Sequence, residues 1–175
     1  SGKSTILNII GLLDKATSGD VILFGQKNIR PFSMKAEQML KNKIGYLFQN
    51  FALIENETVA NNLKLSLENV RGNKKEKISA ALKEVGLEGY ENKKIFKCSG
   101  GEQQRAAIAR LLLKPCELIL ADEPTGSLDI KNREIVVKLL KNMQEQGKTI
   151  IIVSHDSFFE AIADNVIDLS NDVSR

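Results

Sequence analysis

A short apolar run that ends in two acids, at residues 118–123, constrains the fold of this 175-residue chain more than any other stretch. The run reads L-I-L-A, which is the length of a buried parallel strand and too short for a typical helix. It places Asp122 and Glu123 at the carboxyl end of that strand, where open α/β sheets bind their ligands. Because neighbouring strand residues point to opposite faces, one acid can hold a hydrated Mg²⁺ while the other orients a water molecule. Taken alone, the run is equally compatible with a strand that ends in a solvated turn.

The first five residues, Ser1-Gly2-Lys3-Ser4-Thr5, match the last part of a phosphate-binding loop of the form G-x-x-x-x-G-K-[ST]. Gly2 lets the backbone approach a phosphate, Lys3 reaches the β- and γ-phosphates, and the Ser4 hydroxyl can ligate Mg²⁺. G-K-S-T alone is a weak match that also arises by chance. An apolar helix is predicted directly after it, and its N-terminal N–H groups would face the anion, which favours the phosphate-binding interpretation.

Two further polar residues follow strand-like segments. Gln49 closes the predicted strand 44–48, and His155 follows the predicted buried strand 149–154. Without context, Gln49 is an ordinary polar residue at a strand end; the functional alternative is a neutral oxygen ligand that reaches Mg²⁺ or the attacking water. His155, the single histidine of the chain, follows the carboxyl end of a predicted strand, as the two acids do. This position favours a residue that senses the γ-phosphate over a histidine with no role in binding.

A second anion site is indicated by the sequence S-G-G-E-Q-Q-R at 99–105, which opens a helix that continues to Leu113. Ser99 can cap this helix, two glycines leave the backbone N–H groups uncovered, and the helix dipole adds positive potential. The alternative is an ordinary capped helix. Two phosphate sites in one domain make sense if the second serves a nucleotide held by another copy of the chain.

The remaining pattern supplies the rest of an α/β fold. Between 51 and 97 helical periodicity replaces the strands, which predicts a helical insertion whose basic residues, interleaved with acids, form a solvated face. Shorter elements are predicted elsewhere: strands at 21–24 and 166–169, and helices at 35–41, 78–85, 135–143 and 158–163.

Composition excludes some partners and environments. The 25 basic and 22 acidic residues are spread along the chain, so no electrostatic case for nucleic acid arises. Cys98 and Cys116 have neither metal-binding spacing nor the density of a disulfide scaffold, so we expect two reduced thiols in a cytosolic protein. No apolar run approaches the ~18 residues needed to cross a bilayer.

Taken in order, the motifs resemble the nucleotide-binding subunit of ATP-binding cassette (ABC) transporters, over essentially the whole chain. They are G-K-S-T at 2–5, Gln49, S-G-G-E-Q-Q-R at 99–105, L-I-L-A-D-E-P at 118–124, S-L-D at 127–129 and S-H-D at 154–156. The resemblance implies an α/β fold of the P-loop NTPase type, in which a mainly parallel sheet is flanked by helices. It further implies a RecA-like core at 1–49 and 114–175, with its first strand missing, and a helical subdomain at 50–113 that carries the signature motif, S-G-G-E-Q-Q-R at 99–105.

The resemblance also implies a role for each candidate residue. Two copies would pack head to tail, with two ATP molecules sandwiched between the phosphate loop of one copy and the signature motif of the other. The implied ATP-binding residues are Ser1, Gly2, Lys3, Ser4, Thr5, Ser99, Gly100, Gly101, Glu102 and Asp129, the last of which would cross-link the two sites. The implied Mg²⁺ ligands are Ser4, Gln49 and Asp122. The implied catalytic residues are Glu123 as the catalytic carboxylate, His155 and Gln49.

By the same resemblance, the chain would bind and hydrolyse ATP to power a transporter, at the cytoplasmic face of the cell membrane. Its partner would be a transmembrane permease that docks beside Gln49, in a groove built partly from 51–63. The wording E-P-T-G-S-L-D resembles the branch with lipoprotein-release, macrolide-export and bacteriocin-export cassettes, so we expect an exporter of a peptide, a bacteriocin or a lipophilic substrate. Two alternatives stay open: a cassette that regulates a membrane complex without transport, and a soluble cassette ATPase that acts on ribosomes or DNA.

Two departures from the family pattern matter. Cys98 stands where the family usually has leucine, and a small apolar thiol can fill that place. The chain also begins inside the phosphate loop, so the rest of the loop and the aromatic residue that stacks on adenine would precede Ser1. We therefore expect this polypeptide alone to bind ATP poorly and to be inactive as an ATPase, and its full-length parent to bind ATP well.

Overall fold

A parallel sheet of three strands forms the centre of the chain in the computed structural model, which describes residues 2–126 and 128–169. The strands are β3 (Ile44–Leu47), β4 (Leu118–Asp122) and β5 (Thr149–Val153), in the order β3-β4-β5. Leu47 pairs with Ala121, and Asp122 pairs with Val153. All three strands therefore end at the same edge of the sheet.

The middle strand, β4, is covered on both faces, which explains its continuous apolar sequence. Ile119 and Ala121 belong to a hydrophobic cluster with residues of α5 (Gly100–Leu113) and α6 (Ile130–Glu145). Leu118 and Leu120 belong to a second cluster with residues of α1 (Lys3–Ile10) and α2 (Met34–Asn42). The alternation of side chains along one strand thus separates two cores.

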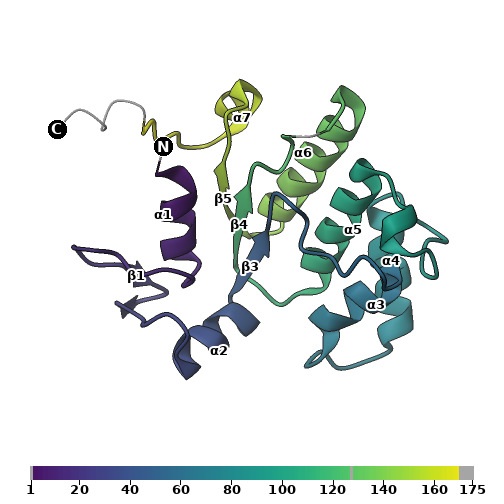
Figure 1. The fold of residues 1–175 in the computed structure, drawn as a ribbon, viewed down its shortest axis with the longest axis horizontal. Coiled ribbons are helices and arrows are strands. Elements are labelled where there is room, and N and C mark those ends of the chain that lie inside the picture. Colours follow the sequence, from purple (N-terminus) through teal and green to yellow (C-terminus); the bar gives the residue numbers. More distant parts are fainter. Residues whose placement is uncertain (1, 127, 170–175) are drawn as a thin grey trace.

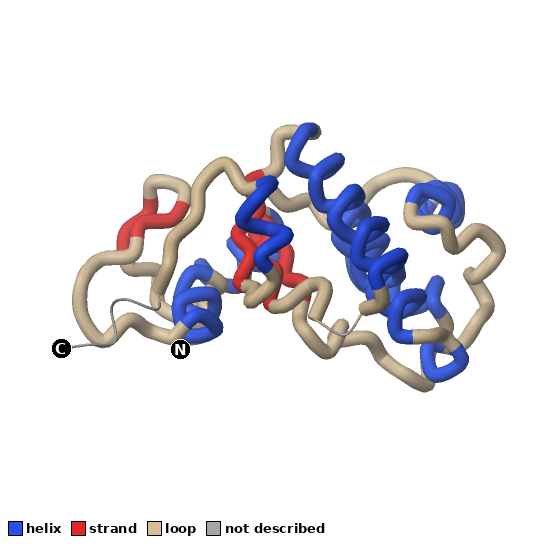
Figure 2. The backbone as a smooth tube through the Cα atoms, turned by 90° about the horizontal axis from the view of Figure 1, so that it is seen from above, coloured by secondary structure: helices blue, strands red, loops and turns tan. Residues whose placement is uncertain are grey.

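The helices form a layer on each side of this sheet (Figure 1). Seen from above, the strands lie between the helix that follows the N-terminus and the larger group of helices (Figure 2). The remaining elements are β1 (Ile22–Leu23) and β2 (Gln26–Lys27), which form an antiparallel hairpin, α3 (Val59–Lys64), η1 (Leu65–Leu67), α4 (Lys74–Glu84), η2 (Ile95–Lys97) and α7 (Ser157–Ile162).

Helix α5 is the contact between the sheet and the smaller helices. Its Ile108 is fully buried, together with Leu63 of α3 and Leu82 of α4. At its C-terminal end, Arg110 donates hydrogen bonds to the backbone carbonyl oxygens of Phe51 and Ala52. Phe51 and Ala52 both have left-handed backbone conformations, with φ of 63° and 47°, so the guanidinium fastens a strained loop to the helix.

Most elements predicted from the sequence are confirmed. The predicted segments 44–48, 118–121 and 149–154 are β3, β4 and β5, and the predicted helices 35–41, 78–85, 135–143 and 158–163 are found as α2, α4, α6 and α7, with different bounds. The predicted strand at 166–169 is wrong. Val166 and Ile167 are 57% and 83% exposed, and no described strand pairs with them, so their apolar character alone does not produce a strand.

Two expectations drawn from composition can be compared with the structure. Cys98 and Cys116 are both free and buried, and Cys98 lies in the hydrophobic cluster around α5, so the thiol fills an apolar place. Burial raises the pKa of the Cys98 thiol.

Among residues 2–126 and 128–169, no helix has the length and apolar character needed to span a membrane.

Candidate active site

The ends of the three parallel strands border a cavity of about 350 Å³. Six of the predicted site residues line it together with Gly126 and Val153: Lys3, Ser4, Gln49, Asp122, Glu123 and His155. They come from the first turn of α1, the segment after β3, the end of β4 and the segment after β5. Residues that are up to 152 positions apart in the sequence therefore converge on one site.

Glu123 is held in a sharp turn directly after β4. Its φ is 45°, an unusual value for a residue with a side chain, and its N–H donates to the carbonyl oxygen of Val153 at 2.9 Å. The hydroxyl of Ser154 donates to Glu123 Oε2 at 3.1 Å, while Oε1 lies 3.7 Å from Nε2 of His155. The carboxylate is thus fixed on one oxygen by a neutral donor and faces the imidazole with the other.

The first turn of α1 supplies the cationic side of the cavity. Gly2 precedes the helix with a φ of 75°, a left-handed conformation that glycine adopts without a steric penalty. Lys3 and Ser4 then line the cavity, and Lys3 Nζ lies 3.3 Å from Nδ1 of His155. Because the N-terminus of a helix carries unpaired N–H groups and a positive dipole end, this side of the cavity suits an anion.

Tyr46 contacts α1 and lies close to Asp122. Its hydroxyl donates to Asn8 Oδ1 at 3.0 Å, and its ring stacks on Phe48 with 4.0 Å between the centroids. Burial, together with the negative charge of Asp122, raises the pKa of Tyr46 to about 12. The phenol therefore stays protonated, and it contributes packing and one hydrogen bond.

The donors around the cavity fit Mg²⁺ bound together with phosphates. Magnesium in proteins is typically held by one or two carboxylates plus substrate phosphates and water, and a cage made only of protein groups is unusual. Asp122 offers a carboxylate, Ser4 a hydroxyl and Gln49 an amide oxygen around the same cavity. Within the described part of the chain, no group of three or more His, Cys, Asp or Glu side chains forms such a cage.

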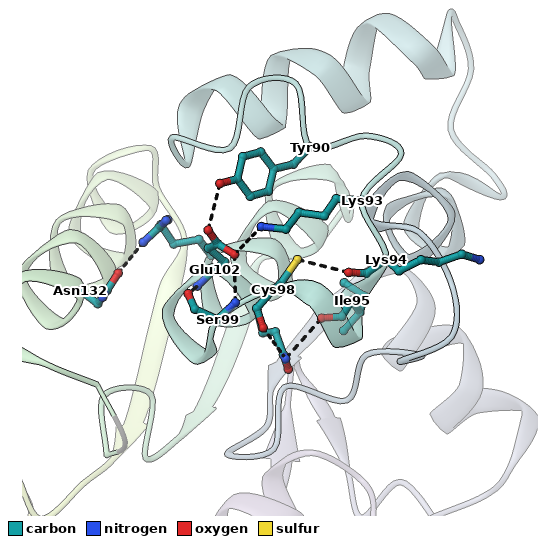
Figure 3. A network of polar contacts seen from close by, with 10 residues as sticks. Tyr90, Lys93, Lys94, Ile95, Cys98, Ser99, Glu102 and Asn132 are labelled. Atoms are coloured by element: carbon teal, nitrogen blue, oxygen red, sulfur yellow. Dashed lines mark hydrogen bonds and ion pairs between the residues drawn. The ribbon is translucent and has the colours of Figure 1, made fainter.

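The signature motif lies elsewhere, at the N-terminus of α5, and does not line this cavity. Ser99 caps the helix as predicted, since its Oγ accepts from the N–H of Glu102, and Glu102 Oε2 accepts from the N–H of Ser99 at 2.9 Å. Tyr90 and Lys93 point toward Glu102 as well (Figure 3), with O–H and Nζ donors at 2.9 and 2.8 Å from its oxygens. The Glu102 side chain is therefore used to hold the start of the helix.

This network changes the acidity of both charged partners. Burial raises the pKa of Glu102, but the hydrogen bonds from Lys93, from the backbone of Ser99 and from Tyr90 outweigh it, so the pKa lies below its ordinary value of 4.5. The hydrogen bond with Glu102 in turn raises the pKa of Lys93 above 10.5. Both shifts favour the ion pair.

Asp129 caps α6 and is joined to the signature motif through Asn132. Its Oδ1 accepts from the N–H of Asn132 at 2.8 Å, and its Oδ2 accepts from the Asn132 side-chain amide. The same Asn132 accepts a hydrogen bond from Arg105 and packs directly against the backbone of Gly101. Asp129 and the signature motif therefore form a second cluster, separate from the cavity.

The structure thus divides the predicted residues into two groups. Lys3 and Ser4 line the cavity, and Gly2 and Thr5 flank them at the start of α1 without lining it. The second cluster contains Ser99, Gly100, Gly101, Glu102 and Asp129. Ser1 lies outside the described residues. Sequence reasoning missed Ser154 as a partner of Glu123, although it belongs to the S-H-D motif. It also missed Tyr46 and Gly126 as neighbours of the site, although Tyr46 lies in the predicted strand 44–48 and Gly126 in the E-P-T-G-S-L-D wording.

Comparison with known proteins shows which family the chain is similar to. A family described as "ABC transporter" matches residues 1–126. The macrolide export ATP-binding/permease protein MacB of Mannheimia succiniciproducens is 40% identical over 174 residues, which cover 98% of this chain and 27% of that protein. MacB of Psychrobacter arcticus is 38% identical, with 98% and 26% covered. The chain therefore spans about a quarter of the length of the curated relatives it matches.

Solved structures give the same result. The ATP-binding cassette MJ0796, in a dimeric post-hydrolysis state bound to ADP and Pi, is 40% identical with a TM-score of 0.79, and the match covers 89% of this chain and 70% of that one. The protein cbiO1 from Clostridium perfringens, part of the ABC transporter complex cbiONQ, is 30% identical with a TM-score of 0.74, covering 89% and 63%. Since the family match extends over most of the sequence and relatives of known structure share the fold, this chain belongs to the ABC transporter family, as an ATP-binding domain with the fold of P-loop NTPases.

Proposed function

We propose that this chain, as part of the full-length protein that contains it, binds Mg-ATP in the cavity at the sheet edge, hydrolyses it, and thereby powers a transporter. The observation that carries the proposal is the convergence of Lys3, Asp122, Glu123 and His155 around one cavity. A cation, a metal-binding carboxylate and a carboxylate that can act as a base are the groups that phosphoryl transfer to water requires.

The residues on the α1 side would hold the phosphates. Lys3 and the N–H groups of the first turn of α1 supply positive potential, and Ser4, Gln49 and Asp122 supply oxygen ligands to Mg²⁺. Bound Mg²⁺ neutralises part of the charge on the phosphates. Chemistry of this kind depends mostly on positioning and charge stabilisation, which a preformed cavity provides.

Glu123 would orient the attacking water and accept its proton. The Ser154 hydroxyl occupies Oε2, so Oε1 is the oxygen left for the water. His155 lies beside Oε1 and beside Lys3, a position from which it can contact the γ-phosphate that those residues surround. Glu123 would thus act on the water, while Lys3 and His155 would contact the phosphate.

A second copy of the chain would complete the site. Ser99, Gly100, Gly101, Glu102 and Asp129 lie away from the cavity of their own chain, which supports a role toward a nucleotide held by another copy. The related cassette MJ0796 is described as dimeric.

We further propose the division into a core of 1–49 and 114–175 and a helical subdomain of 50–113, which the packing of α3 and α4 on α5 supports.

The partner would be a transmembrane permease, which places the chain at the cytoplasmic face of the membrane. The relatives named MacB are macrolide export ATP-binding/permease proteins, and this supports export of a lipophilic substrate. Export of a peptide or bacteriocin is a proposal that rests only on the E-P-T-G-S-L-D wording of the sequence. We propose no nucleic-acid partner, since the 25 basic and 22 acidic residues are interspersed.

Phosphate release from Mg-ATP tests the catalytic part of the proposal. The full-length protein that contains this chain should release phosphate, and Glu123→Gln should keep its affinity for Mg-ATP while turnover falls by roughly 10²–10⁴, the usual scale for a positioned base. Unchanged turnover in Glu123→Gln would remove Glu123 from the mechanism.

A pull-down tests the partner. Full-length Glu123→Gln, loaded with Mg-ATP, is captured from detergent-solubilised membranes of the source cells, with Lys3→Ala as the control that does not retain nucleotide. A multi-pass membrane protein in the eluate supports the transporter. Ribosomal proteins or nucleic acid in its place contradict it.

A further inference from the structure

Gln104 connects the helix that carries the signature motif to the turn that carries Glu123. Its side chain is 1% exposed, and Nε2 donates to the carbonyl oxygen of Pro124 at 2.6 Å. Pro124 is buried and directly follows Glu123. A side chain of α5 therefore reaches the backbone of the catalytic turn of the same chain.

This turn has an unusual conformation that depends on outside support. Glu123 combines a φ of 45° with a following proline, and a residue before proline prefers the extended region. The turn closes through a 3.2 Å bond from the N–H of Gly126 to the carbonyl oxygen of Glu123. From the β5 side it is held by Val153, and by Asp156, which accepts from the hydroxyl of Thr125. Gln104 holds it from the α5 side.

Stability alone does not account for the buried amide of Gln104. Its Oε1 is buried and has no hydrogen-bond partner among the described residues. A buried acceptor without a partner is destabilising, and this offsets what the Nε2 bond contributes. The adjacent Gln103 differs, because its Nε2 donates to the carbonyl oxygens of Ile95 and Cys98 and does not reach the turn.

We infer that Gln104 is a positioning residue that fixes Glu123 through the carbonyl of Pro124. The amide does not touch the reacting atoms; it sets the backbone from which the carboxylate projects. A misplacement of about 1 Å in a reacting group can lower a rate by roughly 10²-fold, so a bond this close to Glu123 matters for turnover. The catalytic part of this inference rests on the function proposed above.

The first test needs no nucleotide. Hydrogen exchange of the backbone amides of Glu123 and Gly126 is compared in full-length wild type, Gln104→Met and Gln103→Met. Methionine keeps the length and helix propensity of glutamine but removes the donor. We expect both amides to exchange about tenfold faster in Gln104→Met, because opening of the turn becomes easier. Gln103→Met should match wild type. Equal exchange in Gln104→Met and wild type overturns the inference.

The second test separates positioning from a loss of structure. Gln104→Met should lower phosphate release by roughly 10–10²-fold and leave the dissociation constant for Mg-ATP within about twofold, because the phosphate-binding side of the cavity is untouched. In the Glu123→Gln background the same substitution should have no further effect, since a residue that acts through Glu123 is not additive with it.

Other outcomes contradict the inference. Additive losses, weakened Mg-ATP binding or failure of Gln104→Met to fold would each show that Gln104 is a structural residue only. If wild type itself releases no phosphate, the proposed function fails, while the exchange comparison still decides whether Gln104 holds the turn.

Discussion

The imidazole of His155 lies between the ammonium of Lys3 and the carboxylate of Glu123. Nδ1 is 3.3 Å from Lys3 Nζ, and Nε2 is 3.7 Å from Glu123 Oε1. Because an ammonium can only donate, Nδ1 is the accepting nitrogen of this contact, and the tautomer that fits carries its proton on Nε2, facing the carboxylate. One ring thus links Lys3, which is proposed to bind phosphate, to Glu123, which is proposed to accept the proton of the attacking water.

Removal of this ring should slow hydrolysis more than it weakens binding. We expect His155→Ala to lower phosphate release by roughly 10²-fold, at the lower end of the range for the loss of one hydrogen-bond donor to charge that develops in the transition state. The affinity for Mg-ATP should change much less, because Lys3 and the first turn of α1 remain. In His155→Gln the side-chain amide can place its nitrogen near the position of Nε2, so this variant should keep part of the activity. Equal turnover in all three proteins would exclude His155 from the reaction.

Lys3 should instead be needed for binding. Lys3→Ala removes the lysine that lines the cavity and should weaken Mg-ATP binding by at least about 10²-fold, since hydrogen bonds to charged groups are the strong ones. Equilibrium binding of labelled Mg-ATP to the full-length protein measures this. Lys15→Ala removes an exposed lysine that does not line the cavity and is the matched control. Retained affinity in Lys3→Ala would show that the cavity is not a phosphate site.

The ion pair at the start of α5 should make stability depend on pH. Glu102→Gln removes the charge but keeps the capping box, because glutamine serves at this position too. The pKa of Glu102 is depressed in the folded state, so its stabilisation is present above 4.5 and is lost as the pH falls through the folded-state value. The pKa of Lys93 is raised, so its stabilisation is present below 10.5 and is lost as the pH rises further.

Melting temperatures of wild type and Glu102→Gln should therefore differ most between these two limits. We expect the variant to melt a few degrees lower at neutral pH, and the two curves to converge in acid and in strong base. A difference that does not change with pH would mean that the charges contribute nothing and that only the shape of the side chain matters.

The two glycines of the signature motif should respond differently to alanine. A Cβ on Gly101 would lie 2.5 Å from Cγ of Asn132, whose amide is already held by Asp129 and Arg105. We expect Gly101→Ala to destabilise the fold by about 1–3 kcal/mol, the usual cost of overpacking. A Cβ on Gly100 meets nothing within 4 Å, so Gly100→Ala should be neutral or slightly stabilising in the helix. Denaturant unfolding of both variants checks this, and equal losses would contradict the contact.

The parts of the fold that local sequence determines were predictable. The ends of α5 and β4 follow from Ser99 as a cap and from the apolar run before Asp122, because caps and strand periods act over a few residues. The convergence of His155 with Glu123 followed from the rule that parallel strands end at one edge. The resemblance to ABC cassettes added the roles of the individual residues.

Features that depend on contacts distant in sequence were not predictable. The hydrogen bond from Gln104 to Pro124 joins residues 20 positions apart, and no pattern in the sequence of either segment predicts it. The hairpin strand Gln26–Lys27 is polar and two residues long, too short to show a period. The predicted strand at 166–169 failed for the opposite reason, since its apolar residues have no described neighbour with which to pair.

The contact of Arg110 with the carbonyl oxygens of Phe51 and Ala52 has a consequence for motion. A loop whose carbonyls are bound to a helix travels with that helix. If α5 and the helices packed on it tilted relative to the sheet, the segment 48–50 after β3 and the segment 114–117 before β4 would have to adjust. Gln49, which lines the cavity, lies in the first of these segments. A change in the angle of the helices would therefore change how far the side-chain amide of Gln49 extends into the cavity.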